Sequence, residues 1–126
     1  MSIENITAVA VGGGLGSLAR YALQGYVYRW TGGGFPYGTL AVNVLGCFFI
    51  GLLAISLEER FLVSPWIRIF LLIGLLGGFT TFSSFSYETI MMMKDGEIFY
   101  PLMNVVGNIM ICLLATYGGM ALGRII

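Results

Sequence analysis

The sequence predicts an all-α integral membrane protein with four spans. Of its 126 residues, 58% are hydrophobic and only 10% are charged, and the mean hydropathy is +0.92. A water-soluble domain usually carries about 25% charged residues. Spans of about 20 residues each use most of the chain, so we expect one membrane domain over residues 1–126, without room for a soluble catalytic domain. The expected spans are residues 6–30, 38–57, 65–93 and 101–124.

Composition excludes several classes of function. Six basic residues balance six acidic ones, which removes the basic surface that a nucleic-acid partner requires. The absence of histidine excludes imidazole proton relays. Cys47 and Cys112 lie inside apolar runs without zinc or redox spacing, and we interpret them as small apolar residues. No nucleophile–base pair is visible, so we expect that the protein is not an enzyme.

The first span, residues 6–30, contains a cluster of glycines. Gly12 and Gly16 form a G-x-x-x-G pair, which is typical of helices that approach a neighbour closely. The cluster lacks the third glycine and the βαβ context of a dinucleotide loop. The only charged side chain before the run is Glu4, where a signal peptide needs basic residues, so we expect a retained span. Aromatic residues near Trp30 indicate a membrane interface.

The second span follows a loop rich in glycine at residues 31–37. Residues 38–57 are almost wholly apolar, and Asn43 is the exception. Three charged residues at 58–60 then end the span in water. An amide inside a lipid-exposed helix is costly unless it finds a partner, so Asn43 becomes a candidate functional residue.

The third span, residues 65–93, is long for one straight crossing. It begins at Pro65, a favourable first residue of a helix. Two adjacent glycines are followed by five hydroxyl residues within the seven positions 80–86, which weakens the helix locally. We therefore predict a break near residues 77–81. Irregular backbone at that depth survives only at a protein interface or beside a water-filled cavity.

The fourth span, residues 101–124, follows a short charged turn at residues 94–97 and carries a polar stripe. The stripe consists of Asn104, Asn108, Cys112 and Thr116. These residues recur every fourth position and therefore share one face of the helix. The stripe predicts either a polar partner helix or the wall of a pore.

The polar residues of the last three spans fit two interpretations. The residues concerned are Asn43, Thr81, Ser84 and Asn108. Each one alone is explained by helix-to-helix hydrogen bonding. Together they coincide with the predicted break and with Phe82 and Phe85, whose ring edges carry partial positive charge. Uncharged donors and ring edges suit a small hard anion that must bind and leave quickly, although composition alone does not identify the anion.

Arg20 and Glu88 are full charges well inside the spans. Either they pair with each other, or each lies in a wet vestibule. Arg20 either raises the local anion concentration at a pore mouth or makes a structural contact at a helix end. Glu88 would repel an anion if ionised, so a hydrogen-bonding or structural role is simpler.

The distribution of basic residues leaves the orientation in the membrane ambiguous. Four spans place both termini on the side of the loop between the second and third spans. That side carries Arg60, Arg68 and Arg124, and the other side carries Arg20, Arg29 and Lys94. Orientation follows the Lys/Arg bias, and three against three gives none. Insertion in both directions permits an antiparallel, dual-topology homodimer.

Three segments together resemble a known family. They read Gly12-Gly13-x-x-Gly16-x-x-x-Arg20, then Gly38-Thr39-x-x-x-Asn43-x-x-Gly46, then Gly77-Gly78-Phe79-Thr80-Thr81-Phe82-Ser83-Ser84-Phe85-Ser86-x-Glu88. In order and spacing they resemble the signature segments of the Fluc (CrcB-type) fluoride ion channels. The third segment is specific, and the resemblance extends over essentially the whole chain.

The resemblance implies an antiparallel dual-topology homodimer in the cell (inner or plasma) membrane, with lipid around it and two pores that export fluoride passively. It implies a pore role for Asn43, Thr81, Phe82, Ser84 and Phe85, a vestibule role for Arg20, and a structural or polar role for Glu88. It also implies a structural sodium ion at the dimer interface, held by the backbone carbonyls of Gly77 and Thr80. Asn108 is a further pore candidate, but it stands where the family resemblance predicts a small hydroxyl residue.

Two other functions compete with a fluoride channel. A small multidrug-type proton-coupled transporter also has four spans and dual topology, but proteins of that type carry a membrane glutamate in the first span. Here the first span carries Arg20, and Glu88 lies in the third. A non-transporting membrane assembly subunit is the other alternative.

Overall fold

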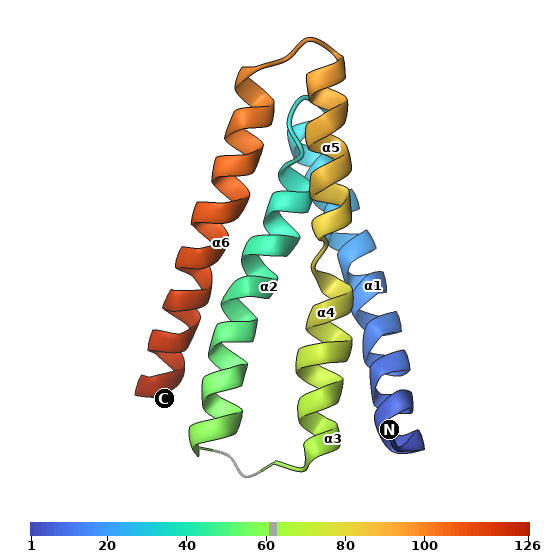
Figure 1. The fold of residues 1–126 in the computed structure, drawn as a ribbon, viewed down its shortest axis with the longest axis vertical. Coiled ribbons are helices and arrows are strands. Elements are labelled where there is room, and N and C mark those ends of the chain that lie inside the picture. Colours follow the sequence, from blue (N-terminus) through green and yellow to red (C-terminus); the bar gives the residue numbers. More distant parts are fainter. Residues whose placement is uncertain (61–62) are drawn as a thin grey trace.

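The computed structural model describes residues 1–60 and 63–126, and every element in these residues is a helix (Figure 1). Residues 61–62 and the side chain of Arg60, which the charge count includes, lie outside this description. Four helices are long and apolar enough to cross a membrane: Ile3–Thr31, Tyr37–Glu59, Pro65–Lys94 and Phe99–Ile125. The predicted all-helical class with four membrane-length helices is therefore confirmed.

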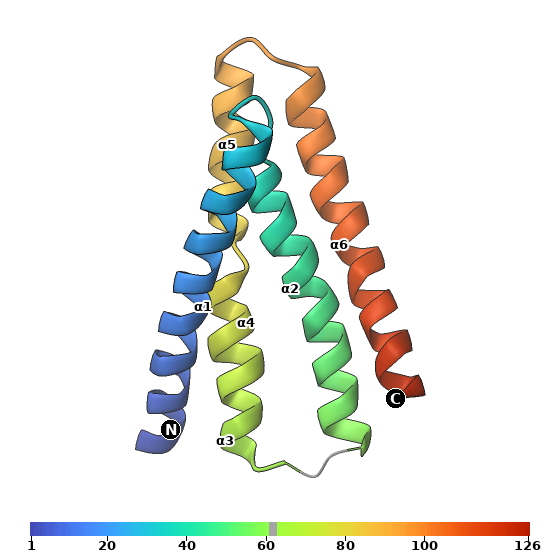
Figure 2. The ribbon, with the colours of Figure 1, turned by 180° about the vertical axis from the view of Figure 1, so that it is seen from behind.

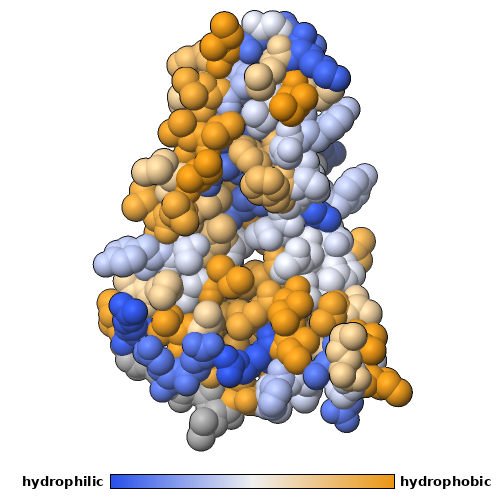
Figure 3. Space-filling model, viewed as in Figure 1, coloured by the Kyte–Doolittle hydropathy of each residue, from blue (hydrophilic) through white to orange (hydrophobic). Residues whose placement is uncertain are grey.

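The distribution of side chains is the reverse of that in a water-soluble protein. Large apolar residues cover much of the face shown in Figure 3, and Leu113 and Leu114 are each 65% exposed. Polar side chains are buried instead, including Thr39 and Asn104, both 0% exposed. Soluble proteins bury apolar residues and expose polar ones. The protein is therefore a multi-pass membrane protein whose apolar exterior faces lipid.

The first span forms one continuous helix, α1 (Ile3–Thr31), despite its glycine cluster. The Ser2 side chain caps it by accepting a hydrogen bond of 3.2 Å from the Asn5 backbone N–H. A Cβ atom at Gly12 would lie 2.6 Å from the Phe70 carbonyl oxygen, and one at Gly16 would overlap the backbone at Leu75. The predicted close approach of the G-x-x-x-G pair to a neighbour is confirmed, and the neighbour is the third span.

The third span is broken, as predicted. Its first part consists of α3 (Pro65–Arg68), the π-helical segment η2 (Ile69–Leu75) and α4 (Leu76–Phe79), and its second part is α5 (Phe82–Lys94). Between the two parts, Thr80 and Thr81 are extended, with ψ angles of 159° and 113°.

The break is shorter than the predicted range of residues 77–81, because Gly77 and Gly78 are still helical. A Cβ atom at Gly78 would lie 2.5 Å from the carbonyl oxygen of Gly13 in α1. Gly78 therefore serves close helix packing here. The extended conformation belongs to the two threonines that follow.

The second and fourth spans run side by side in the same direction. The second span consists of α2 (Tyr37–Ile55) and the π-helical segment η1 (Ser56–Arg60), and the fourth is α6 (Phe99–Ile125). A Cβ atom at Gly51 would overlap the Thr116 backbone, and one at Gly119 would overlap the Phe48 backbone. Figures 1 and 2 show α2 between α6 and the third span. Small residues therefore set the separation of α2 and α6, as in other membrane helix pairs.

Both termini lie at the end of the molecule where α2 leads toward α3, as the sequence predicts (Figure 2). At this end Arg68 forms an ion pair of 2.6 Å with Glu58. Arg20 is not at the opposite end, because its guanidinium contacts the Thr80 carbonyl at the break. The charge count then becomes three against two, so the bias in orientation is at most one basic residue.

Candidate functional site at the break in the third span

The start of α5 is stabilised by the hydroxyl residues that follow the break. The Thr81 hydroxyl accepts a hydrogen bond of 3.1 Å from the Ser84 backbone N–H, which makes Thr81 the N-cap of α5. The same hydroxyl donates to the Ser84 Oγ at 3.1 Å and lies 3.3 Å from the Ser83 Oγ. Thr81 and Ser84, both predicted site residues, are therefore joined directly.

Asn43 of α2 binds the extended backbone at the break. Its Oδ1 accepts from the Thr81 N–H at 2.8 Å, and its Nδ2 donates to the Thr81 carbonyl at 3.0 Å. The Nδ2 also donates to the Asn108 Oδ1 at 3.1 Å. Backbone groups without a partner inside a bilayer cost several kcal/mol each. The Asn43 amide supplies both partners that Thr81 loses when the helix is interrupted.

The network continues from Asn43 through α6 to α5. Asn108 Nδ2 donates to both the backbone carbonyl and the Oδ1 of Asn104, each at 3.0 Å. Asn104 Nδ2 donates to the Thr89 hydroxyl at 2.9 Å, which donates to the Phe85 carbonyl at 2.7 Å. The first two members of the predicted polar stripe thus have polar partners on neighbouring helices.

A cavity of about 340 Å³ lies beside this network. Its lining residues are Asn43, Cys47, Thr80, Thr81, Phe82, Phe85, Asn108, Ile109, Cys112, Leu113 and Thr116. The rings of Phe82 and Phe85 meet edge to face, with centroids 5.2 Å apart. Phe85 is 7% exposed and Phe82 is 77% exposed. The structure therefore brings five of the six predicted pore residues to one cavity, and the sixth, Ser84, is bonded to one of them.

Arg20 and Glu88 have separate partners. Arg20 Nη1 donates to the Thr80 carbonyl at 3.5 Å. The Glu88 Oε1 accepts from the Thr39 hydroxyl at 2.8 Å and from the Tyr28 hydroxyl at 3.4 Å. The sequence left open whether Arg20 and Glu88 pair with each other, and in the structure they do not form an ion pair. Glu88 is held instead by hydroxyl groups of α1 and α2.

Sequence reasoning missed the residues that surround Glu88. Gln24 of α1 donates to the Thr39 hydroxyl at 3.1 Å, which places Gln24, Tyr28, Thr39 and Glu88 in one cluster. A signal was present, because Arg20, Gln24 and Tyr28 recur every fourth position and share a helix face. Thr39 likewise lies four residues before Asn43. Thr89, which ends the amide network, lies four residues after Phe85.

The backbone carbonyls of Gly77 and Thr80 are oxygen groups of the type that a hard cation prefers. In an unbroken helix the Thr81 N–H would donate to the Gly77 carbonyl, but here it donates to Asn43. The Thr80 carbonyl follows an extended residue and receives a long contact from Arg20, which leaves one of its two lone pairs. Hard cations prefer oxygen ligands. Gly77 is exposed in the described chain.

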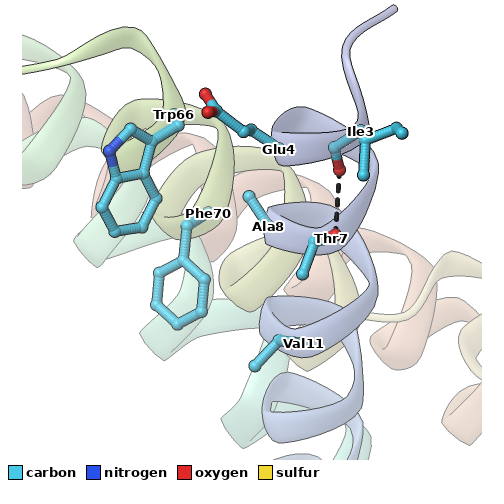
Figure 4. Close-up of a pocket in the computed structure, with 7 residues that line it drawn as sticks. All are labelled: Ile3, Glu4, Thr7, Ala8, Val11, Trp66 and Phe70. Carbon is cyan, nitrogen blue, oxygen red and sulfur yellow. Dashed lines mark hydrogen bonds between the residues drawn. The ribbon is translucent and has the colours of Figure 1, made fainter.

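A second cavity, of about 510 Å³, lies between the start of α1 and the start of the third span (Figure 4). Trp66 and Phe70 face α1 there, and the Thr7 hydroxyl is bonded to the Ile3 carbonyl at 2.9 Å. Glu4 contributes a carboxylate, which accepts hydrogen bonds when ionised. This cavity does not gather donors for an anion, and the break remains the candidate site.

Comparison with known proteins agrees with the resemblance of the motifs. The family model described as CrcB-like protein, Camphor Resistance (CrcB), matches residues 7–120. The Fluoride-specific ion channel FluC of Geobacter sulfurreducens is 49% identical over 122 residues, which cover 97% of this chain and 98% of the relative. The protein of the same name from Thermus thermophilus is 48% identical over 124 residues, covering 98% and 96%. The one from Magnetococcus marinus is 45% identical over 121 residues, covering 96% and 98%.

Proposed function

This chain belongs to the CrcB-like protein family, and on that premise we propose that it is a fluoride-selective channel that exports fluoride passively across the cell membrane. The observation that carries the proposal is the cavity at the break, whose lining combines hydroxyl, amide and phenyl groups and contains no ionised side chain among the described residues. The named relatives are fluoride-specific channels. Their function is the one that this lining supports best.

The chemistry of the cavity suits a small anion that must not be trapped. Phenyl ring edges carry partial positive charge, and hydroxyl groups donate one hydrogen bond each. Neither binds as strongly as a lysine or arginine would, so an ion that enters can also leave. The groups that we assign to the ion are Phe82 and the one hydroxyl proton that the Thr81–Ser84 pair leaves free, since Thr81 donates its own proton to Ser84.

The role of Asn43 follows from its hydrogen bonds. Its Nδ2 group donates to the Thr81 carbonyl and to Asn108, and its Oδ1 accepts from Thr81. We assign Asn43 to positioning: it keeps the Thr81 backbone extended, so that the Thr81 side chain reaches the cavity. Asn108 extends the same network toward α6.

Export needs no coupled energy source. Neutral hydrogen fluoride enters cells from an acidic medium, dissociates in the cytoplasm and is trapped there as the anion. A negative-inside membrane potential drives each fluoride ion outward with about 2.3 kcal/mol per 100 mV. A selective pore is therefore enough to lower the cytoplasmic concentration.

The proposed assembly is an antiparallel homodimer in which each copy inserts with opposite orientation. The near balance of basic residues at the two ends supports it, because the orientation signal is weak. Gly77 and Phe82 are exposed on one chain, and a second copy would bury them in the membrane interior. The carbonyls of Gly77 and Thr80 from both copies would hold a sodium ion, which would supply a fixed positive charge between them.

The experiment that tests selectivity uses purified protein in liposomes loaded with potassium fluoride. A fluoride electrode should record rapid efflux once a potassium ionophore removes the opposing voltage. Parallel vesicles loaded with chloride should release it at a rate close to that of protein-free vesicles. Chloride efflux as fast as fluoride efflux would refute the proposal.

Phe82→Ile is the sharpest change at the cavity, because it keeps an apolar side chain but removes the ring edge. We expect the rate of fluoride efflux to fall at least about tenfold, which corresponds to an increase of about 1.4 kcal/mol in the activation free energy of permeation. The dimer should remain intact on gel filtration. Phe99→Ile is the matched control, since Phe99 is also exposed but lies at the start of α6. Unchanged efflux in the Phe82 variant would exclude the ring from the ion path.

Gly77→Val tests the proposed dimer and sodium ion together. Within the described chain a Cβ atom at Gly77 has no neighbour within 4 Å, so the variant should fold as a monomer but lose dimer assembly and any dependence of efflux on sodium. Gly118→Val is the control, since its Cβ is equally unhindered among the described residues. A Gly77 variant that dimerises normally and keeps its sodium dependence would count against the assembly.

A further inference from the structure

The two cysteines occupy equivalent positions on two neighbouring helices. Cys47 of α2 and Cys112 of α6 are both free and half-buried, and both line the cavity at the break. The sequence suggested that they are small apolar residues without a common role. Their arrangement shows two thiol groups at one site.

The register of α2 against α6 explains why these thiols meet. Asn43 is hydrogen-bonded to Asn108, and Gly51 packs against the Thr116 backbone. Cys47 lies four residues from both Asn43 and Gly51, and Cys112 lies four residues from both Asn108 and Thr116. Residues four apart share a helix face. In two parallel helices the thiols therefore fall between two contacting pairs, and both line the same cavity.

We propose that Cys47 and Cys112 form a two-thiolate binding site for a soft divalent cation of the mercuric type. Thiolate is a soft ligand that selects soft metals. Zinc requires about four ligands, whereas the described residues contain no cluster of three or more histidine, cysteine or acidic side chains. A mercuric ion binds two thiolates on opposite sides and is satisfied by this pair alone.

The charge balance within the membrane favours a divalent ion. Two thiolates carry two negative charges, and an uncompensated charge is costly at this depth. A monovalent soft ion would leave one negative charge, but a divalent one gives a neutral unit. In the binding step two S–H bonds and the two mercury–chloride bonds of mercuric chloride break, two sulfur–mercury bonds form, and two protons and two chloride ions pass to water. No electron is transferred, so the step requires no oxidant.

The position of the site has a functional consequence, which rests on the proposed fluoride conduction. The bound ion would occupy the cavity lined by Thr81, Phe82 and Phe85. Mercuric chloride should therefore stop fluoride efflux from liposomes, and a dithiol should restore it. In a variant with both cysteines replaced by serine, mercuric chloride should leave that variant's own rate of efflux unchanged.

The decisive experiment measures binding and does not depend on flux. Reduced, desalted protein in detergent is titrated with mercuric chloride in excess glutathione, and the mercury retained per chain is counted by mass spectrometry after gel filtration. The wild type should retain one ion per chain and lose both dithionitrobenzoate-reactive thiols together. Cys47→Ser and Cys112→Ser should each retain mercury about 100-fold more weakly, because only one thiolate then competes with glutathione.

Two results would overturn the site: two mercury ions per wild-type chain, or single-serine variants that hold mercury as firmly as the wild type. If a serine variant fails to assemble, the titration of the wild type still tests the site. One mercuric ion shared by both cysteines makes both thiols unreactive at one equivalent per chain, whereas independent binding needs two equivalents. Wild-type vesicles that carry no fluoride would contradict the proposed function but leave the mercury count unaffected.

Discussion

The interface between α2 and α6 has two halves that hold the same pair of helices together in different ways. In the half near the start of both helices, Asn43 meets Asn108 through a hydrogen bond of 3.1 Å. In the other half, Gly51 and Gly119 let the backbones come into direct contact. Glycine contact depends on shape and forms without a specific donor or acceptor. The amide half depends on hydrogen bonds between specific donors and acceptors. Through Asn43, these hydrogen bonds connect the interface to the broken helix.

The two halves show where this membrane protein accommodates polar side chains. Buried amides are costly in a bilayer, and here Asn43 provides partners for the Thr81 backbone while Asn104 pairs with Asn108 and Thr89. Both α2 and α6 are regular helices whose backbones are satisfied internally, so small residues suffice at the Gly51 and Gly119 contacts. The polar half of the interface is therefore linked to the break in the third span through Asn43.

The glycine half should give the largest effect on stability. Gly119→Val places side-chain atoms against the backbone of Phe48 and Leu52, and we expect a loss of more than about 3 kcal/mol, because backbone cannot move aside as a side chain can. Gly118→Val, one residue earlier and unhindered among the described residues, should change stability by less than about 0.5 kcal/mol. Unfolding by dodecyl sulfate in mixed micelles, followed by tryptophan fluorescence, measures both. Equal effects would show that the helices are not in backbone contact.

The amide half should give an intermediate effect that is tied to the break. Asn43→Leu leaves the Thr81 N–H and carbonyl without their partners, and we expect a loss of about 2 kcal/mol. Hydrogen exchange at the Thr81 amide should accelerate at the same time. Val42→Leu is a control for added volume at an adjacent buried position. Slow exchange at Thr81 in the Asn43 variant would contradict the positioning role.

The far end of the network should give the smallest effect and show whether its members act together. Thr89→Val removes the acceptor of Asn104 and should cost about 0.6 kcal/mol, an average value for hydrogen bonds between membrane helices. Asn104→Leu should cost more, because Asn108 also donates to it. The double variant should lose less stability than the sum of the losses measured for the two single variants. Strict additivity would mean that the hydrogen bond between Thr89 and Asn104 contributes nothing.

The sequence predicted the break because its causes are local. Glycines and hydroxyl residues weaken a helix wherever they occur, so a break near residues 77–81 could be predicted without knowing which helices lie next to them. The exact place was decided by contacts: Gly78 stays helical against Gly13, and Thr81 leaves the helix because Asn43 binds its backbone.

The four membrane-length helices, the common side of the two termini and the polar face of the fourth span could all be predicted from the sequence. Hydropathy and helical periodicity depend on residues that are close together in the sequence, so both can be evaluated without knowledge of the fold. The pairing of Glu88 with Thr39, and the meeting of Cys47 and Cys112 at one cavity, became visible only in the folded chain. Such pairs depend on the register between helices, which is set by close packing at a few glycines, and neighbours in that register are 49 and 65 residues apart in the chain.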